Sequence, residues 1–377
     1  MKVLFFSRDY TNHDHRWLQA LTDAGYQVSF LRLERAGSNH DQRPLPEGVS
    51  EVDWSGGKEA FKWEMAEKLQ AELNEIITRE QPDILHAGPL NTGSVLAART
   101  GFHPLVQMSW GSDILRFAQE DKAERVRVQE SLNAADSLIG DCHAVRQAAI
   151  SMGMDNEAIA TFPWGIDIQR FSPNSRNAKL HSEIGWADDA FVVLHTRALE
   201  AAYGVPGVVD AFIEAAQKDA RLHFLFAGGG SLHSQIQSNF EAAGLSARVH
   251  FAGQLSQAQQ PDIFRSANLY VSGTFSDGSS VSLMEALASG LPVLVSDIPG
   301  NREWVEHGAQ GWLFPAGDIE ALAHKLLAAA QSSPAELQAM RKAARAQAEA
   351  RADWSQNQLL IPQAYAIALQ QAKEAVS

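Results

Sequence analysis

The sequence predicts an α/β protein that consists of two doubly wound domains. Short apolar segments of strand length alternate with longer amphipathic segments, which is the pattern of parallel sheets covered by helices. This alternation stops near Phe162 and begins again after Pro173. A chain of 377 residues also exceeds the usual size of one hydrophobic core. We therefore expect two domains of similar architecture.

The first domain is expected over residues 1–165. Its first strand begins directly after the N-terminal Met, because no charged and apolar leader precedes the apolar residues 3–6. Strands are predicted at 2–6, 28–31, 84–86, 105–108, 137–139 and 160–162. Helices are predicted at 17–24, 58–80, 93–99, 122–134 and 144–152.

The second domain is expected over residues 166–355 and repeats the same architecture. Strands are predicted at 191–195, 222–226, 249–251, 268–272, 292–295 and 311–314. A helix is predicted at 281–289, directly after the fourth of these strands and a short loop, and Gly290 ends it. Parallel strands bring their carboxyl ends to one edge of a sheet, so a ligand site is expected at that edge.

Charge and cysteine content argue against several classes of function. The chain has 31 Lys and Arg against 45 Asp and Glu, and this net charge of −14 argues against binding to nucleic acid or to an anionic membrane surface. No apolar run reaches membrane-spanning length, which leaves only peripheral contact with a membrane open. Cys142 is the only cysteine, so no disulfide forms within the chain and a reducing compartment, the cytoplasm, is expected.

The most informative segment, residues 272–304, carries two carboxylates around a predicted strand-to-helix turn. Asp277 lies at the mouth of the turn and Glu285 lies inside the helix. The loop between them presents backbone N–H groups at a helix N-terminus, which favours an anion. The two carboxylates suit two sets of hydroxyls on one ligand, such as a sugar nucleotide. Two simpler interpretations exist: Ser282 and Glu285 have capping-box spacing, and Asp277 fits an ordinary turn.

The same segment resembles the donor-binding signature of the retaining glycosyltransferases of the GT-B fold, the large family of glycosyl transferases group 1. That signature is Glu, seven residues, a second Glu and then Ala-x-Ala-x-Gly-x-Pro-Val. Glu285 matches the second Glu, residues 286–293 follow in register, and Asp277 stands in place of the first Glu. The resemblance is strong over 185–320 and loose over 1–160. It implies two Rossmann-like domains that face a central cleft, and a C-terminal helix over 356–377 that crosses back to the first domain.

The resemblance also implies a set of donor-binding residues. Arg197 follows the strand at 191–195 and corresponds to a cation that holds the donor diphosphate, but Tyr203 stands where the family has a lysine. Asp277 is expected to hold the sugar hydroxyls, Glu285 the ribose, and Arg197 the leaving group. Further donor contacts are expected from Gly278, Ser279, Ser280, Val281, Gly228 and Gly229. The simpler alternatives are a surface salt bridge for Arg197 and a left-handed turn for the glycines.

Acceptor-binding residues are expected in the first domain. The loop after the first strand offers His13 and Asp14, although Asp14 alternatively caps a helix that starts at His15. Trp110 and Asp113 resemble the family's His-Gly-x-Asp with Trp in place of His, and a packing role for Trp110 is the simpler alternative. His86 ends another strand and is expected to line the acceptor pocket. No metal site is expected, because the His13-Asp14-His15 run lacks an identifiable third ligand.

The expected function is therefore a cytoplasmic glycosyltransferase that needs neither metal nor cofactor. The resemblance implies transfer of a sugar with retention, by front-face attack, from a UDP- or GDP-sugar to a glycan, a glycolipid or a small molecule. A sugar-nucleotide epimerase of the same fold is one alternative. A protein that binds sugar nucleotides with weak or no turnover is another, because Tyr203 and Trp110 replace a lysine and a histidine.

Overall fold

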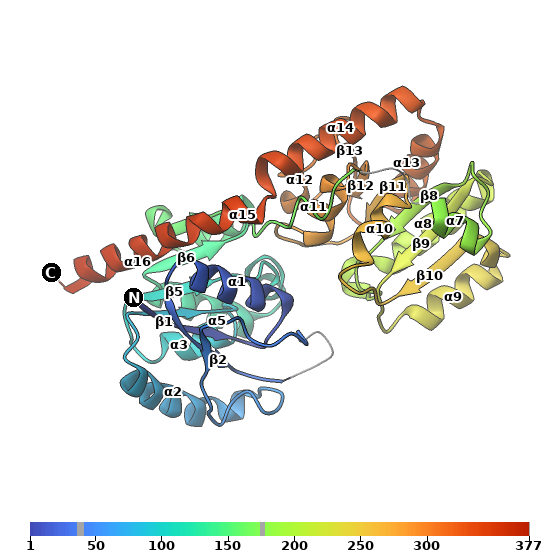
Figure 1. Cartoon of the computed structure of the whole chain (residues 1–377). Coiled ribbons are helices and arrows are strands. Elements are labelled where there is room, and N and C mark those ends of the chain that lie inside the picture. The colour runs from blue at the N-terminus through green and yellow to red at the C-terminus, as the bar shows by residue number, and fades with distance from the viewer. Residues whose placement is uncertain (36–40, 174–177, 377) are drawn as a thin grey trace. The chain divides into compact units, whose positions relative to one another are not determined.

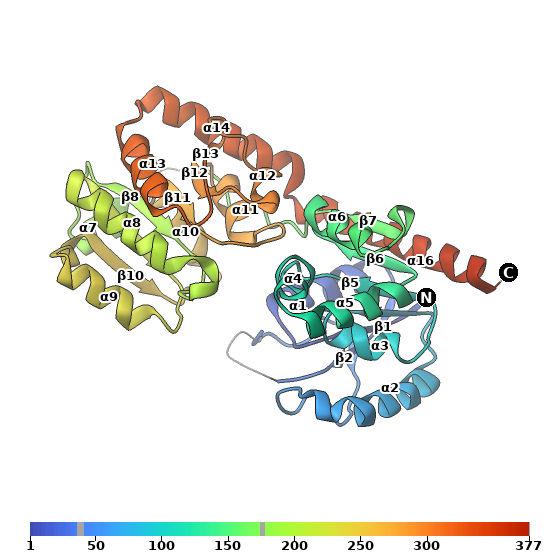
Figure 2. The same cartoon turned by 180° about the vertical axis from the view of Figure 1, so that it is seen from behind.

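The computed structural model describes residues 1–35, 41–173 and 178–376 (Figures 1 and 2). The chain forms two compact units. The N-terminal unit comprises Met1–Pro163 together with the segment that starts at Gln356, and the C-terminal unit comprises Trp164–Ser355. Residue 377 of the predicted C-terminal segment lies outside the described residues. No helix of the described ranges combines the length and the apolar character needed to cross a membrane.

The N-terminal unit contains a seven-stranded parallel sheet in the order β3-β2-β1-β4-β5-β6-β7. Its strands are β1 (Lys2–Ser7), β2 (Gln27–Arg32), β3 (Val49–Glu51), β4 (Ile84–Ala87), β5 (Leu105–Met108), β6 (Ser137–Gly140) and β7 (Ile159–Thr161). The six predicted strands of this half are confirmed. The missed strand, β3, is a partly exposed edge strand of only three residues, so it lacks the apolar run of a buried strand.

Helices cover this sheet: α1 (Asn12–Asp23), α2 (Ala66–Glu80), α3 (Gly93–Ala98), α4 (Ala118–Glu120), α5 (Lys122–Ala134), α6 (His143–Ser151) and α16 (Ile361–Val376). Two predicted helix starts were wrong. α1 begins earlier than predicted because Thr11 caps it. α2 begins later, because the backbone of Glu59 and Phe61 bonds to Arg35 and Glu34 instead of entering a helix. α16 packs along β5, β6 and β7 (Figures 1 and 2).

The C-terminal unit contains a six-stranded parallel sheet in the order β10-β9-β8-β11-β12-β13. Its strands are β8 (Phe191–His195), β9 (Leu222–Ala227), β10 (Val249–Gly253), β11 (Leu269–Ser272), β12 (Val293–Ser296) and β13 (Gly311–Phe314), and all six were predicted. Its helices are α7 (Ala178–Ile184), α8 (Val205–Lys218), α9 (His233–Ala242), α10 (Gln260–Arg265), α11 (Val281–Ala288), α12 (Pro299–Arg302), α13 (Ile319–Gln331), α14 (Pro334–Arg351) and α15 (Trp354–Asn357), which runs past Ser355 into the N-terminal unit.

Each sheet has one point where the strand order reverses. In the N-terminal unit it lies between β1 and β4, and in the C-terminal unit between β8 and β11. The helices that follow two such strands leave toward opposite faces, so the loops after the strands diverge and open a crevice at the carboxyl edge. In the C-terminal unit, α8 packs in the apolar core on one face of the sheet and α11 in the core on the other. The sequence-predicted site residues of both units cluster around these two points.

Candidate functional site

The loops after β8 and β11 lie against each other at the switch point of the C-terminal unit. Gly204 closes the loop after β8 with a positive φ of 68°. A Cβ atom at Gly204 would lie 2.1 Å from the carbonyl oxygen of Gly273, the first residue after β11. Glycine is therefore required at position 204 both for the backbone conformation and for the close approach of the two loops.

Arg197 lies in the loop after β8 and contacts three other predicted site residues. Its Nη2 is 3.0 Å from Asp277 Oδ2, and its Nη1 donates to Ser280 Oγ at 3.0 Å. The guanidinium carbon lies 4.3 Å from the centre of the Tyr203 ring. Arg197 thus forms a salt bridge, as the alternative interpretation has it, but only 16% of its side chain is exposed, so this is not a fully solvated surface pair. Burial acts to lower the pKa of Arg197, but the Asp277 carboxylate together with the phenols of Tyr270 and Tyr203 outweighs burial, and the pKa is raised.

The loop of Asp277–Ser280 leads into α11, whose N-cap is Ser280. Gly278 N–H donates to Asp277 Oδ1 at 3.1 Å, and Trp304 Nε1 donates to Ser279 Oγ at 3.3 Å. The capping-box interpretation of Glu285 is wrong, because Ser282 is the second helical residue and not the cap. Val281 begins the helix, and Glu285 lies about a turn and a half inside it and is partly exposed.

The segment after β12 packs against the backbone of the Asp277 loop. A Cβ atom at Gly300 would lie 2.4 Å from the carbonyl oxygen of Asp277 and 2.6 Å from that of Gly278. Ser296 Oγ donates to the carbonyl of Thr274, and Asn301 Nδ2 donates to the carbonyl of Ser296 at 2.9 Å. Sequence reasoning missed these supporting residues, although the Pro-Gly-Asn after a predicted strand was a usable signal of a tight turn.

The glycine run after β9 packs on the loop after β8. Gly229 accepts a hydrogen bond from Leu199 N–H at 2.9 Å, and Gly228 N–H donates to Gly253 O at 2.8 Å. Gly228 has a positive φ of 123°, a conformation that favours glycine, so the simpler interpretation of this run as a glycine turn agrees with the backbone of Gly228. A Cβ atom at Gly230 would lie 2.4 Å from the carbonyl oxygen of Leu199. This run therefore brings a third loop to the same edge of the sheet.

Two of the predicted acceptor residues lie side by side in the N-terminal unit. The rings of His13 and Trp110 are 6.0 Å apart and nearly perpendicular, and both side chains are partly exposed. His13 comes from the start of α1 and Trp110 from the loop after β5. Burial, with a smaller contribution from Arg16, lowers the pKa of His13 to about 3, so its ring is neutral at physiological pH. A neutral imidazole and an indole face are surfaces that suit a sugar ring.

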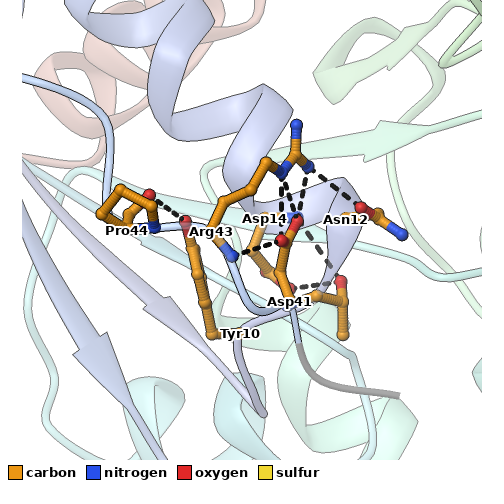
Figure 3. A network of polar contacts seen from close by, with 7 residues as sticks. Tyr10, Asn12, Asp14, Asp41, Arg43 and Pro44 are labelled. Atoms are coloured by element: carbon orange, nitrogen blue, oxygen red, sulfur yellow. Dashed lines mark hydrogen bonds and ion pairs between the residues drawn. The ribbon is translucent and has the colours of Figure 1, made fainter. Parts of the chain in front are cut away.

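Asp14 does not face a ligand, contrary to the prediction. Its side chain is fully buried and accepts hydrogen bonds from the N–H of Thr11 at 2.8 Å and from Thr11 Oγ1 at 2.5 Å (Figure 3). Thr11 is the N-cap of α1 and Asp14 is its capping-box partner, so the alternative in which Asp14 caps a helix from His15 is also wrong. Asp14 is the third residue of α1 and its carboxylate turns back to the N-cap Thr11, which spacing in the sequence alone does not show.

Figure 3 also shows a clamp that sequence reasoning missed. The Arg43 guanidinium pairs with the Asp41 carboxylate, and Arg43 Nη2 donates to Asn12 Oδ1 at 2.9 Å. The Tyr10 hydroxyl donates to the carbonyl of Pro44 at 3.0 Å. The clamp therefore fastens the segment at 41–44 to the loop after β1 and to the first turn of α1.

We expect Asp14 to make stability depend on pH. Burial is the main cause that raises its pKa from 3.8 to about 6, so the folded state holds this proton more tightly than the unfolded state does. The carboxyl therefore stabilises the fold below about pH 4 and loses this contribution, about 3 kcal/mol, as the pH rises through about 6. Urea unfolding from pH 3.5 to 7.5 should show this decline in wild type relative to Asp14→Asn. A constant difference between the two proteins over that range would contradict the assignment.

Asp113 and His86 are also buried, and their predicted contact with an acceptor is wrong. Asp113 is 1% exposed and accepts hydrogen bonds from Ser109 Oγ at 2.7 Å and from three backbone N–H groups, those of Leu90, Trp110 and Ile114. It therefore braces the loop after β4 against the loop after β5. His86 is fully buried, and its Nδ1 lies 2.8 Å from the Tyr365 hydroxyl of α16. Burial lowers the pKa of His86 to about 3, which makes it a neutral core residue.

The described side chains include no group of three or more His, Cys, Asp and Glu residues arranged to hold a metal ion. The groups that suit an anionic ligand lie at the β8–β11 switch point. The largely buried guanidinium of Arg197, the N-terminus of α11 and the hydroxyl of Ser280 come together there, and such a set of donors can bind a phosphate group.

Sequence comparisons match both units to glycosyltransferase families. The family model of glycosyl transferases group 1 matches residues 177–347, and that of the glycosyl transferase 4-like family matches residues 2–142. The amylovoran biosynthesis glycosyltransferase AmsK of Erwinia amylovora is 31% identical over 188 residues, which are 48% of this chain and 44% of AmsK. Phosphatidyl-myo-inositol mannosyltransferase of Mycobacterium leprae is 34% identical over 152 residues, or 40% of this chain and 37% of the relative. The matched segments thus span less than half of either relative.

A solved structure shares the architecture over nearly the whole chain. HepE from Anabaena, crystallised with UDP and glucose, superimposes with a TM-score of 0.79 at 21% identity and covers 97% of this chain and 99% of its own. At this identity the likeness concerns the fold. The two family matches and the shared two-unit architecture together show that the chain belongs to the group 1 glycosyltransferases of the GT-B fold.

Proposed function

We propose that this protein is a cytoplasmic enzyme that transfers a sugar, with retention, from a nucleotide sugar to a glycan or lipid-linked acceptor. The observation that carries the proposal is the largely buried Arg197 at the β8–β11 switch point, between Asp277 and the N-terminus of α11. A largely buried cation beside a helix N-terminus that no side chain caps matches the charge of a nucleoside diphosphate. HepE was crystallised with UDP and glucose, which favours a UDP-sugar as donor here as well. The name of AmsK favours a polysaccharide as product.

The reaction follows from the charge that develops as the donor breaks. The bond from the anomeric carbon to the phosphate oxygen breaks, and the acceptor hydroxyl forms a new bond to the same face of that carbon. Its proton passes to the leaving phosphate oxygen. Arg197 and the amides at the start of α11 stabilise the diphosphate as it gains charge. Asp277 holds hydroxyls of the transferred sugar, and Glu285, inside α11, holds the ribose.

The N-terminal unit supplies the acceptor side in this proposal. His13 and Trp110 present a neutral imidazole and an indole to a carbohydrate acceptor. Asp113 acts indirectly, because its Oδ2 accepts a hydrogen bond from the backbone N–H of Trp110 at 3.1 Å and so holds the Trp110 loop in place. No step requires a metal ion, since Arg197 and the helix N-terminus supply the positive charge that the leaving group needs.

A screen of nucleotide binding tests the proposal first. Thermal shift and calorimetry with UDP, GDP, ADP and their common sugars should show that one nucleotide binds. Glu285→Ala should lower the affinity for that nucleotide at least about tenfold, because a contact with the ribose is lost. Glu241→Ala, which removes an exposed carboxylate from α9, is the matched control and should leave affinity unchanged. If wild type binds no nucleotide, the transferase proposal is wrong.

A binding protein with little turnover is the second candidate, and Tyr203 is the observation that favours it. The Tyr203 ring lies against Arg197, and by the resemblance Tyr203 takes the place of a lysine. The site would then offer a diphosphate less positive charge than a site with both cations. Assays with the bound donor and a panel of acceptors separate the two candidates. Release of nucleotide that depends on an acceptor supports the transferase, and tight binding without release supports the binding protein.

A further inference from the structure

A buried tyrosine of β11 lies at the start of a chain of hydroxyls that ends at Arg197. Tyr270 is fully buried, and its ring packs near Phe264 in the core between the sheet and α11. Burial of a phenol is unfavourable unless its hydroxyl has a partner. The Tyr270 hydroxyl lies 2.7 Å from the Oγ of Ser282 in the first turn of α11, which meets this requirement, and the side chain of Thr196, in the loop after β8, also interacts with it.

The chain of hydroxyls continues from Ser282 to the guanidinium. Ser282 Oγ lies 3.3 Å from Ser280 Oγ, which accepts a hydrogen bond from Arg197 Nη1 at 3.0 Å. Tyr270, Ser282 and Ser280 are all buried, with at most 9% of each residue exposed. Water therefore has little access to these hydroxyls, and hydrogen bonds to neighbouring side chains satisfy them.

Ser280 uses its hydroxyl in an unusual way for its position. A serine at the N-cap normally accepts a hydrogen bond from an N–H in the first helical turn. Ser280 is the N-cap of α11, yet its side chain makes no such bond. Its hydroxyl serves Arg197 and Ser282 instead. The chain therefore orients the guanidinium and at the same time leaves the first-turn amides of α11 without a serine cap.

We propose that Tyr270 is a positioning residue for the phosphate end of the donor site. Through Ser282 and Ser280 it fixes Arg197 and keeps the Ser280 hydroxyl away from the amides of α11, so that both the cation and the amides face a diphosphate. This inference rests on the proposed function, because it assigns the ligand of Arg197 as the diphosphate of a nucleotide donor. The inference adds Tyr270 to the donor site, although in the sequence Tyr270 looks like any aromatic residue of the hydrophobic core.

Tyr270→Phe removes one hydroxyl and keeps the ring in the core. We expect the dissociation constants of UDP and of pyrophosphate to rise about tenfold, which corresponds to about 1.4 kcal/mol, while that of uridine changes less than about twofold. GDP and guanosine are measured in parallel. Calorimetry measures the affinities of the diphosphates, and ligand-observed NMR measures those of the nucleosides. Ser282→Ala should give the same pattern, and Tyr270→Phe added to Ser280→Ala should cause little further loss, because both act through one chain.

Tyr365→Phe is the matched control, since it removes another buried tyrosine hydroxyl, the one that contacts His86 in the N-terminal unit. It should leave all these affinities unchanged. Equal loss of UDP and uridine in Tyr270→Phe, or unchanged pyrophosphate affinity in both Tyr270→Phe and Ser282→Ala, would overturn the positioning role while the transferase proposal stands. Absence of binding by UDP, GDP and pyrophosphate to wild type would overturn both.

Discussion

Replacing Arg197 with alanine is expected to lower the rate of sugar transfer by a factor on the order of 10²–10³, because the leaving diphosphate loses its main positive partner. The loss should appear mainly in kcat, since charge on the diphosphate grows as the glycosidic bond breaks. The effect should be large because Arg197 is the cation that contacts Asp277 and Ser280 here, and its neighbour Tyr203 carries no positive charge. Steady-state kinetics with the donor identified by the nucleotide screen measure it.

Two further variants make this prediction specific. Arg197→Lys keeps the charge but cannot bond both Asp277 Oδ2 and Ser280 Oγ in the planar geometry of a guanidinium, so we expect an intermediate loss. Arg221→Ala removes an arginine that pairs with Asp219 on the surface of the same unit, and it should leave transfer unchanged. Equal activity of Arg197→Ala and wild type would show that Arg197 serves only to pair with Asp277.

The sequence predicted the strands, and the edge of the sheet at which the candidate site residues meet, for one physical reason. Strands of a parallel sheet are buried on both faces, so they stand out as short apolar runs, and the loops after them meet at one edge. Arg197 and Asp277 are 80 positions apart in the sequence, yet each lies in the loop that follows a predicted strand. Their 3.0 Å contact follows from β8 and β11 being neighbours in the sheet.

Side-chain burial explains most of what the sequence did not predict. Asp14, Asp113 and His86 have polar side chains at or after strand ends, which favours a ligand role when only spacing is known. In the structure each is buried and bonded to its neighbours, for example His86 to α16 from the far end of the chain. Tyr270 is a buried aromatic residue of a strand, and the sequence gives no sign of the contact between its hydroxyl and Ser282. Hydrogen bonds between separate segments leave no local pattern in the sequence.

The ion pair between Arg197 and Asp277 gives Asp277 two opposing effects on the donor. Without a ligand, the Asp277 carboxylate is the partner of the guanidinium that a phosphate would otherwise take. A second negative charge beside a diphosphate also repels it. Once the phosphate has displaced the carboxylate, Asp277 is released to accept hydrogen bonds from the sugar hydroxyls. The same residue should therefore weaken nucleotide binding and strengthen transfer.

Asp277→Asn separates these effects, and we expect binding and turnover to move in opposite directions. Affinity for UDP should rise about tenfold, because the negative charge that competes for Arg197 is lost, while transfer should fall by a factor on the order of 10² as the sugar is held less well. Calorimetry and kinetics on the same preparations measure both. Asp262→Asn, which neutralises an exposed carboxylate that pairs with Arg265, is the control and should change neither. Weaker UDP binding in Asp277→Asn would show that the carboxylate supports the nucleotide directly, and the ion pair would then be part of the bound site and not its competitor.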